Sequence, residues 1–112
     1  MAKEVLGEFE HQVLLAAIRL AMGAYSSAIV AELEAVTGRD VSAAAVYIAL
    51  RRLEENGLAR SELRPPRDEP GGRERRYFRP TADGLDLLRR SRRRFLGLWD
   101  GLEPVLDEGG AP

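Results

Sequence analysis

Apolar residues recur at intervals of three and four near the start of the chain and predict an amphipathic helix from about Gly7 to Met22. Two neighbouring faces of this helix are apolar, so we expect it to pack on two sides, one within its own domain and the other available to a second subunit. Gly23 is a suitable stop. One face carries Phe9, Val13, Ala17 and Leu20, and the other carries Leu6, Leu14, Ile18 and Ala21.

A second, shorter helix is predicted from Ser26 or Ser27 to Thr37. Either serine can cap its first turn, because a side-chain hydroxyl accepts a hydrogen bond from a backbone N–H that has no partner within the helix. Gly38 suits the left-handed conformation that commonly ends a helix.

A third helix is predicted after Ser42, its N-cap, and should end near Asn56 and Gly57. Its periodicity separates a buried face from an exposed one. The exposed face includes a tyrosine, an isoleucine and an arginine, which is unusual for a surface that serves only solubility. The residues expected inside are Val46, Ala49, Leu50 and Leu53, and those expected outside are Ala44, Tyr47, Ile48, Arg51 and Glu55.

The pattern then changes to strand-like segments, LARSELR and RERRYFRP, on either side of the loop PPRDEPGG, which predicts a β-hairpin. A long final helix begins at the N-cap residue Thr81. Pro104 should end or kink it near Glu103. Its apolar seam is interrupted by Arg92 and consists of Leu85, Leu88, Phe95, Trp99, Leu102 and Leu106.

This order of elements predicts a mainly α fold with a two-stranded β-wing. We expect a winged helix-turn-helix DNA-binding domain over residues 1–80, a long C-terminal dimerisation helix over residues 81–106, and a disordered tail over residues 107–112.

The formal net charge of −1 conceals a strong asymmetry along the chain. Residues 1–50 hold three basic and six acidic groups, residues 51–94 hold fourteen and eight, and residues 95–112 hold none and four. Every basic group of the middle segment is an arginine, which can form several directed hydrogen bonds with a phosphate or a guanine. A charged segment is often only a solvated surface, but this one overlies the predicted third helix and hairpin and therefore favours DNA contact.

Composition narrows the other classes of function. The absence of cysteine excludes disulfides and thiolate metal sites, and a single histidine, His11, excludes a multi-histidine metal site. The carboxylates do not converge, and the glycines do not have P-loop spacing, so we expect neither an enzyme nor a cofactor. No apolar run is long enough to span a bilayer, and the N-terminus lacks the pattern of a signal peptide, so the expected location is the cytoplasm.

The predicted third helix is of a size that enters a major groove, whereas a basic hairpin can lie along the phosphate backbone. Alanines at the start of this helix can contact a thymine methyl but cannot form hydrogen bonds with guanine. Direct readout would then depend on the serine, tyrosine and arginine of the helix. The candidate DNA-binding residues are Ser42, Ala44, Tyr47, Arg51, Arg67, Arg73, Arg75 and Arg76.

The stretches VSAAAVYIALRRLEENGLARSEL and GGRERRYFRPTADG resemble the PadR family of transcriptional regulators, and LGEFEHQVLLAAI is similar to its first helix. The resemblance covers Leu6 to Trp99. It departs from the family where Ala24 precedes Tyr25 and where Ala43 begins the third helix. The residues that carry it are Val46, Tyr47, Leu50, Arg52, Leu53, Glu54, Gly57, Leu58, Arg76, Tyr77, Thr81 and Gly84.

The resemblance implies the short subfamily with a single C-terminal helix, a homodimer held by that helix against the partner's first helix, and repression that a small molecule relieves. Aromatic residues of the seam favour dimer packing; the alternative is an effector site at the dimer axis, where a flat aromatic molecule stacks on Trp99 from each copy. The candidate residues for the dimer or effector are Phe9, Val13, Phe95, Trp99 and Leu102.

A second hypothesis uses the same fold without DNA. The exposed Ile48 and the alanine-rich start of the third helix are compatible with a winged-helix module that binds another protein.

Overall fold

The computed structural model describes residues 6–66 and 69–107. Three helices form the body of the molecule: α1 (Glu8–Leu20), α2 (Ser26–Thr37) and α3 (Ala43–Glu55), with a short 3₁₀ turn, η1 (Ala21–Gly23), after α1. The α2–α3 pair is the expected helix-turn-helix.

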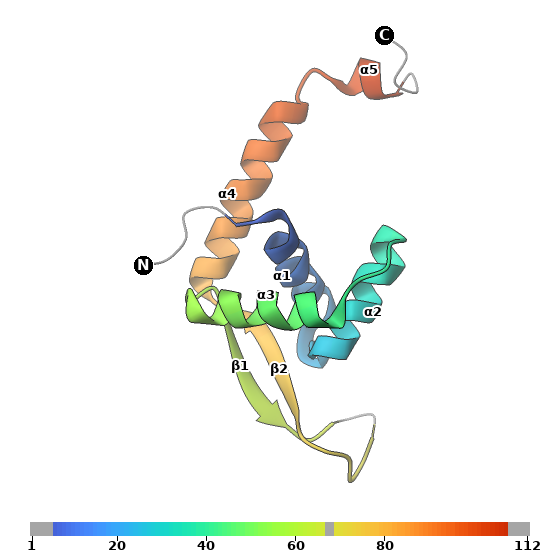
Figure 1. Cartoon of the computed structure of the whole chain (residues 1–112). Coiled ribbons are helices and arrows are strands. Elements are labelled where there is room, and N and C mark those ends of the chain that lie inside the picture. The colour runs from blue at the N-terminus through green and yellow to red at the C-terminus, as the bar shows by residue number, and fades with distance from the viewer. Residues whose placement is uncertain (1–5, 67–68, 108–112) are drawn as a thin grey trace.

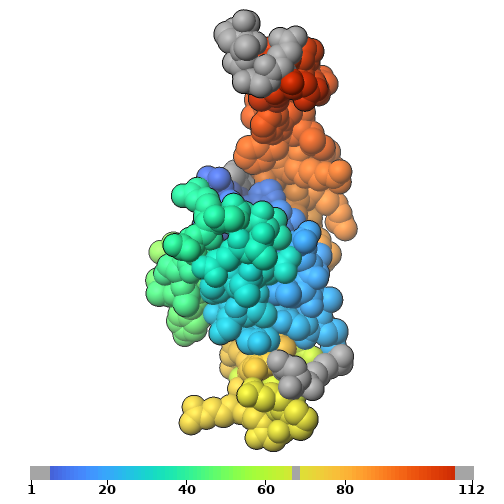
Figure 2. All heavy atoms as spheres, turned by 90° about the vertical axis from the view of Figure 1, so that its right-hand side faces the viewer, coloured from blue at the N-terminus to red at the C-terminus, as the bar shows by residue number. Residues whose placement is uncertain are grey.

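Two elements project from this body in opposite directions (Figure 1). The antiparallel strands β1 (Ala59–Arg64) and β2 (Arg75–Pro80) form the wing on one side. Helix α4 (Ala82–Trp99) extends from the other side and has α5 (Glu103–Asp107) at its far end. The space-filling view shows α4 and α5 rising clear of the surface made by α1 and α2 (Figure 2). The predicted fold class is confirmed.

The hydrophobic core lies where the three body helices meet the base of the wing and the first turns of α4. Each fully buried leucine stabilises the folded state by about 1.5–3 kcal/mol relative to an exposed one. The largest fully buried side chains are Leu14, Ile29, Leu50, Leu53, Leu58, Leu87, Val13 and Val46. All four residues predicted to point inward from α3 are buried.

The caps predicted for α3 and α4 are present. Ser42 Oγ accepts a hydrogen bond of 3.1 Å from the backbone N–H of Ala45. Thr81 Oγ1 accepts one of 3.1 Å from Gly84 N–H and donates one of 2.6 Å to the carbonyl of Gly57. Gly38 has the left-handed φ of 70° expected after α2.

The junction between α1 and α2 differs from the prediction. Helix α1 ends at Leu20, before the predicted Met22, because Ala21 turns to a φ of 50°. Neither Ser26 nor Ser27 caps α2; the N-cap residue is Tyr25, which makes no side-chain capping bond. The extended backbone of this junction instead pairs with β2, where Phe78 N–H donates a 2.8 Å hydrogen bond to the carbonyl of Ala24. A tertiary contact therefore sets the start of α2.

The C-terminal helix is also shorter than the predicted residues 81–106. Helix α4 ends at Trp99, and the chain turns through Gly101, whose φ of 81° suits glycine and breaks the helical path. Pro104 does not end a helix here; it lies in the first turn of α5, where proline is tolerated. Asp107, predicted to begin a disordered tail, belongs to α5, and residues 108–112 lie outside the described part of the chain.

Candidate nucleic-acid interface

The outer face of α3 presents an arginine held beside an aromatic ring. Tyr47 is 54% exposed, and Arg51 Nη1 donates a hydrogen bond of 3.1 Å to its hydroxyl. The guanidinium carbon lies 5.9 Å from the ring centroid. This hydrogen bond raises the pKa of Arg51 above its ordinary value. The other residues predicted to point outward, Ala44, Ile48 and Glu55, are exposed.

The start of α3 offers a hydroxyl with two uses. Ser42 is exposed, and its oxygen accepts the capping bond from Ala45. Because a hydroxyl can accept and donate at once, its proton remains able to reach a phosphate oxygen near the helix N-terminus, where the helix dipole also favours an anion.

The wing is fixed to α3 by one carboxylate. Glu54 Oε2 accepts hydrogen bonds from the backbone N–H of Ser61, at 3.1 Å, and from its hydroxyl, at 2.7 Å. Glu54 lies near the end of α3 and Ser61 lies in β1, so the wing leaves the body at the C-terminal end of α3 (Figure 1). The exposed helix and the basic hairpin are thereby held in one arrangement.

Two tyrosines and two arginines form a stack beside the loop end of the wing's ladder. Arg64 and Arg75 are directly opposite in the β-ladder, where like charges destabilise a strand pair. Each guanidinium instead lies 4.1 Å from a tyrosine centroid, Arg64 over Tyr77 and Arg75 over Tyr25. The two rings meet edge to face at 5.7 Å. Cation–π contact thus offsets the repulsion of the two charges.

The structure gives the predicted wing arginines different surroundings. Arg75 is half-buried and also pairs with Glu69 at 3.1 Å, so its guanidinium already has structural partners. Arg73 and Arg76 are exposed, and Arg76 donates a 3.1 Å hydrogen bond to the hydroxyl of Ser61. Arg67 lies outside the described residues.

Sequence reasoning missed a cationic pair at the base of the wing. Arg60 and Arg79 face each other in the ladder and are both exposed. Both line a shallow pocket of about 150 Å³ that Met22 also lines. Counting the hairpin register outward from the loop could have revealed this pair, since strand partners follow from loop length.

An apolar groove between α1 and α4 contains part of the predicted dimer or effector set. This α1–α4 groove has a volume of about 410 Å³ and is lined by Leu15, Ile18, Leu88, Phe95 and Trp99, with His11, Leu85, Arg89, Arg92 and Leu96. Phe95 and Trp99 are about half exposed.

The other members of that set lie elsewhere. Phe9 is half-buried and packs against the core, and Leu102 is exposed beyond the end of α4. Val13 has no exposed surface, because it belongs to the protomer's own core. The expectation that Val13 faces a second copy is therefore wrong, and the exposed side of α1 is formed by Leu15 and Ile18.

His11 lies at the edge of the α1–α4 groove. Its Nδ1 is 3.1 Å from the hydroxyl of the buried Ser91, which joins α1 to α4. Partial burial lowers the pKa of His11 below its ordinary value of 6.5. Burial therefore favours the neutral imidazole, in a groove that is also lined by two arginines.

Within residues 6–66 and 69–107, no three acidic or histidine side chains come together in a way that could hold a metal ion. None of the helices in the same ranges has the length and apolar character needed to cross a membrane.

Comparison with known proteins gives a consistent result. The profile of the Transcriptional regulator PadR-like family matches residues 14–90. A solved PadR family transcriptional regulator from Eggerthella lenta DSM 2243 is 31% identical, with a TM-score of 0.61, and the match covers 86% of this chain and 84% of that one. No curated protein matches the chain.

Two more distant structures share the fold. A PadR family transcription regulator from Clostridium difficile R20291 is 22% identical over 86% of this chain and 97% of its own, with a TM-score of 0.62. A transcriptional regulator from Clostridium thermocellum is 19% identical over 93% and 97%, with a TM-score of 0.61.

Proposed function

Because the chain belongs to the PadR-like family of transcriptional regulators, we propose that it is a homodimeric, sequence-specific DNA-binding repressor that acts in the cytoplasm and is released by a small molecule. The observation that carries the DNA-binding part is the exposed Tyr47–Arg51 pair on α3, next to a wing that Glu54 fixes in place. An exposed helix of this size fits the major groove, and a basic hairpin beside it can follow the backbone.

We assign base readout to α3 and phosphate contact to the wing. Arg51 can donate two hydrogen bonds to a guanine, and Ala44 can contact a thymine methyl. Arg73 and Arg76 are exposed and suited to phosphates, whereas Arg75 is held by Tyr25 and Glu69 and contributes mainly by keeping the wing in position. Ser42 can donate its hydroxyl proton to a phosphate at the start of α3.

We assign dimerisation to the α1–α4 groove. The exposed Phe95, Trp99 and Leu102 form an apolar surface on α4 and the segment after it, and such surfaces are rarely left open on a monomer. A closed twofold dimer would present two α3 helices and two wings, so the operator should be a pseudo-palindrome with half-sites one or two helical turns apart.

The effector part rests on the aromatic residues of the same groove. With Trp99 from two copies near the dimer axis, a planar aromatic molecule could stack between them. Titration of the dimer with a panel of planar aromatic compounds should quench or shift the Trp99 fluorescence. An unchanged spectrum across a diverse panel would leave Trp99 with a packing role alone.

A mobility-shift assay on the DNA upstream of the chain's own gene tests the proposal. Arg51→Ala should change the preferred sequence, because it removes a base contact. Arg73→Ala should weaken binding to all sequences alike and reduce the slope of log K against log salt by about 0.9 for each phosphate that is no longer neutralised. If the wild-type chain fails to bind duplex DNA at low salt, the protein-binding alternative, with Ile48 at its centre, is favoured instead.

A further inference from the structure

A second apolar groove lies between α1 and α2. This α1–α2 groove has a volume of about 350 Å³, and its apolar wall is formed by Leu15, Ile18, Leu33 and Val36. Val36 is 58% exposed, which is high for an aliphatic residue on a helix that packs in the body. A surface of this kind marks a place where something docks.

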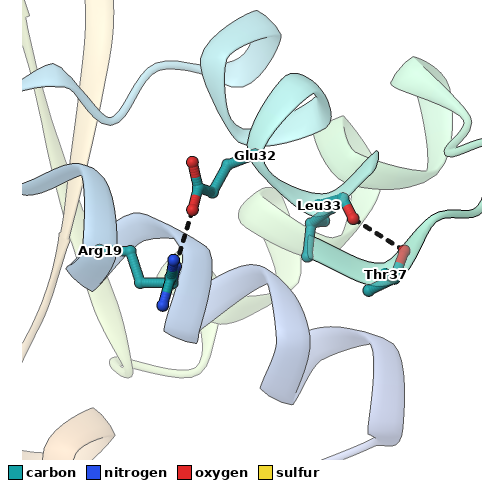
Figure 3. Close-up of polar contacts among 4 residues, drawn as sticks. All are labelled: Arg19, Glu32, Leu33 and Thr37. Atoms are coloured by element: carbon teal, nitrogen blue, oxygen red, sulfur yellow. Dashed lines mark hydrogen bonds and ion pairs between the residues drawn. The ribbon is translucent and has the colours of Figure 1, made fainter. Parts of the chain in front are cut away.

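Two polar contacts lie among the residues that line this groove (Figure 3). Arg19 of α1 points toward Glu32 of α2, with Nε 2.7 Å from the carboxylate. Thr37 turns its hydroxyl back to the carbonyl of Leu33, at 2.7 Å. The rest of the lining is apolar except for Gln12.

The segment at the C-terminal end of α4 has the complementary character. None of the residues of α5 is buried, and Leu102, Val105 and Leu106 are each nearly half exposed. Their spacing of three and four places them on one side of a helical turn. Glu103 and Asp107 flank this apolar side with two negative charges. The segment is amphipathic but lies beyond the body of its own protomer (Figures 1 and 2).

We propose that α5 of one copy docks in the α1–α2 groove of a second copy, with Leu102, Val105 and Leu106 against Val36 and Ile18. The inference rests on the proposed homodimer and adds a second contact to it. Arg19 supplies the charge complement. Its side chain is 61% exposed, and Nε alone has a partner among residues 6–66 and 69–107. Its terminal nitrogens can therefore receive the carboxylate of Glu103 or Asp107.

The geometry of a twofold dimer brings these surfaces together. Two helices that cross at a perpendicular twofold axis run antiparallel, so residues equally far from the axis face each other. With the axis near Phe95, Trp99 of one copy lies level with Ser91 of the other, and α5 follows beyond it. Leu88 lines the α1–α4 groove, and Leu15 and Ile18 line both grooves. One continuous apolar strip thus leads from α4 across α1 to α2.

The absence of cysteine in the natural chain allows a direct test by disulfide formation. Two full-length single variants, Val36→Cys and Leu106→Cys, are mixed, oxidised and separated without reductant. We expect a mixed disulfide dimer in roughly tenfold excess over that from the control pair Ile48→Cys and Leu106→Cys, because only docked residues have Cβ atoms within disulfide reach. Ile48 is exposed to a similar degree but lies on α3.

Sedimentation of the natural chain separates failure of this contact from failure of the dimer. If the natural chain is a dimer at micromolar concentration while Val36→Cys and Leu106→Cys do not combine above the control, the dimer stands and the α5 contact is refuted. If the natural chain is a monomer, the homodimer itself is refuted, and the α5 contact with it.

A charge exchange provides an independent readout. Arg19→Glu and Glu103→Arg should each raise the dissociation constant of the dimer about tenfold to twenty-fivefold, because the twofold dimer contains the pair twice and each partly exposed ion pair contributes up to about 1 kcal/mol. The double variant should recover most of the affinity. Both side chains are exposed, so neither change should prevent folding. Additive effects in the double variant would contradict the proposed pair.

Discussion

Replacement of Gly84 by alanine should destabilise the protein, although the same change in a helix normally stabilises it. Gly84 lies in the first turn of α4 and is buried against the chain that precedes the wing. A Cβ at this position would approach the carbonyl oxygen of Leu58 to less than 3.0 Å and its carbonyl carbon to 3.1 Å. Backbone atoms cannot rotate away as a side chain can, so α4 itself would have to move.

The surrounding contacts make that movement costly. The carbonyl of Leu58 also accepts a 3.0 Å hydrogen bond from Thr81 N–H, and the new methyl would lie 3.4 Å from Leu14 Cδ2. Overpacking costs about 1–3 kcal/mol, and weakening the hydrogen bond adds about 1 kcal/mol. The intrinsic preference of a helix for alanine over glycine returns about 1 kcal/mol. We therefore expect Gly84→Ala to lower the free energy of unfolding by about 1–3 kcal/mol.

Gly97 provides a matched control on the same helix. Within residues 6–66 and 69–107, no atom outside its own stretch of helix lies within 4 Å of the position that its Cβ would occupy. Gly97→Ala should therefore raise the free energy of unfolding by about 0.5–1 kcal/mol. Urea unfolding followed by circular dichroism, at one fixed protein concentration because the dimer couples to stability, gives both values. If Gly84→Ala is as stabilising as Gly97→Ala, the close approach of α4 to Leu58 is wrong.

Three further predictions concern the interface and its supports. Ser42→Ala should cost about 1 kcal/mol of stability because it removes the cap. Ser42→Asp should keep the cap but weaken DNA binding, because its carboxylate repels a phosphate. If Ser42→Asp binds DNA with unchanged affinity, the start of α3 does not contact the DNA backbone. Tyr25→Leu should lower the free energy of unfolding by about 1–2 kcal/mol and speed amide hydrogen exchange in the wing, whereas Tyr25→Phe keeps the ring and should do neither. Equal exchange rates in the two variants would contradict the stack of tyrosines and arginines. The pKa of His11 is lowered in the folded state, so the unfolded chain binds the proton more readily. The free energy of unfolding should therefore decrease as the pH is lowered from about 6.5 to the pKa of the folded state. His11→Gln should remove this part of the pH dependence, and an identical pH profile in His11→Gln would show that another group is responsible.

Short-range features of this fold could be predicted from the sequence. The caps at Ser42 and Thr81, the left-handed Gly38 and the buried face of α3 depend on residues within one or two helical turns of each other. The order of helices and hairpin, and hence the winged helix and the exposed Tyr47 and Arg51, also follows from local periodicity. These features do not depend on the distant parts of the chain.

Other features depended on contacts between residues far apart in the sequence. Val13 and Leu15 are both apolar residues of α1, but only the packing of the body shows that Val13 is buried and Leu15 is exposed. Arg75 and Arg73 look equivalent in the sequence, and only the register of the wing and its contact with Tyr25 give Arg75 a structural role. Periodicity indicates which face of an element is apolar. It cannot indicate which neighbour covers that face, because that neighbour is brought there by the rest of the fold.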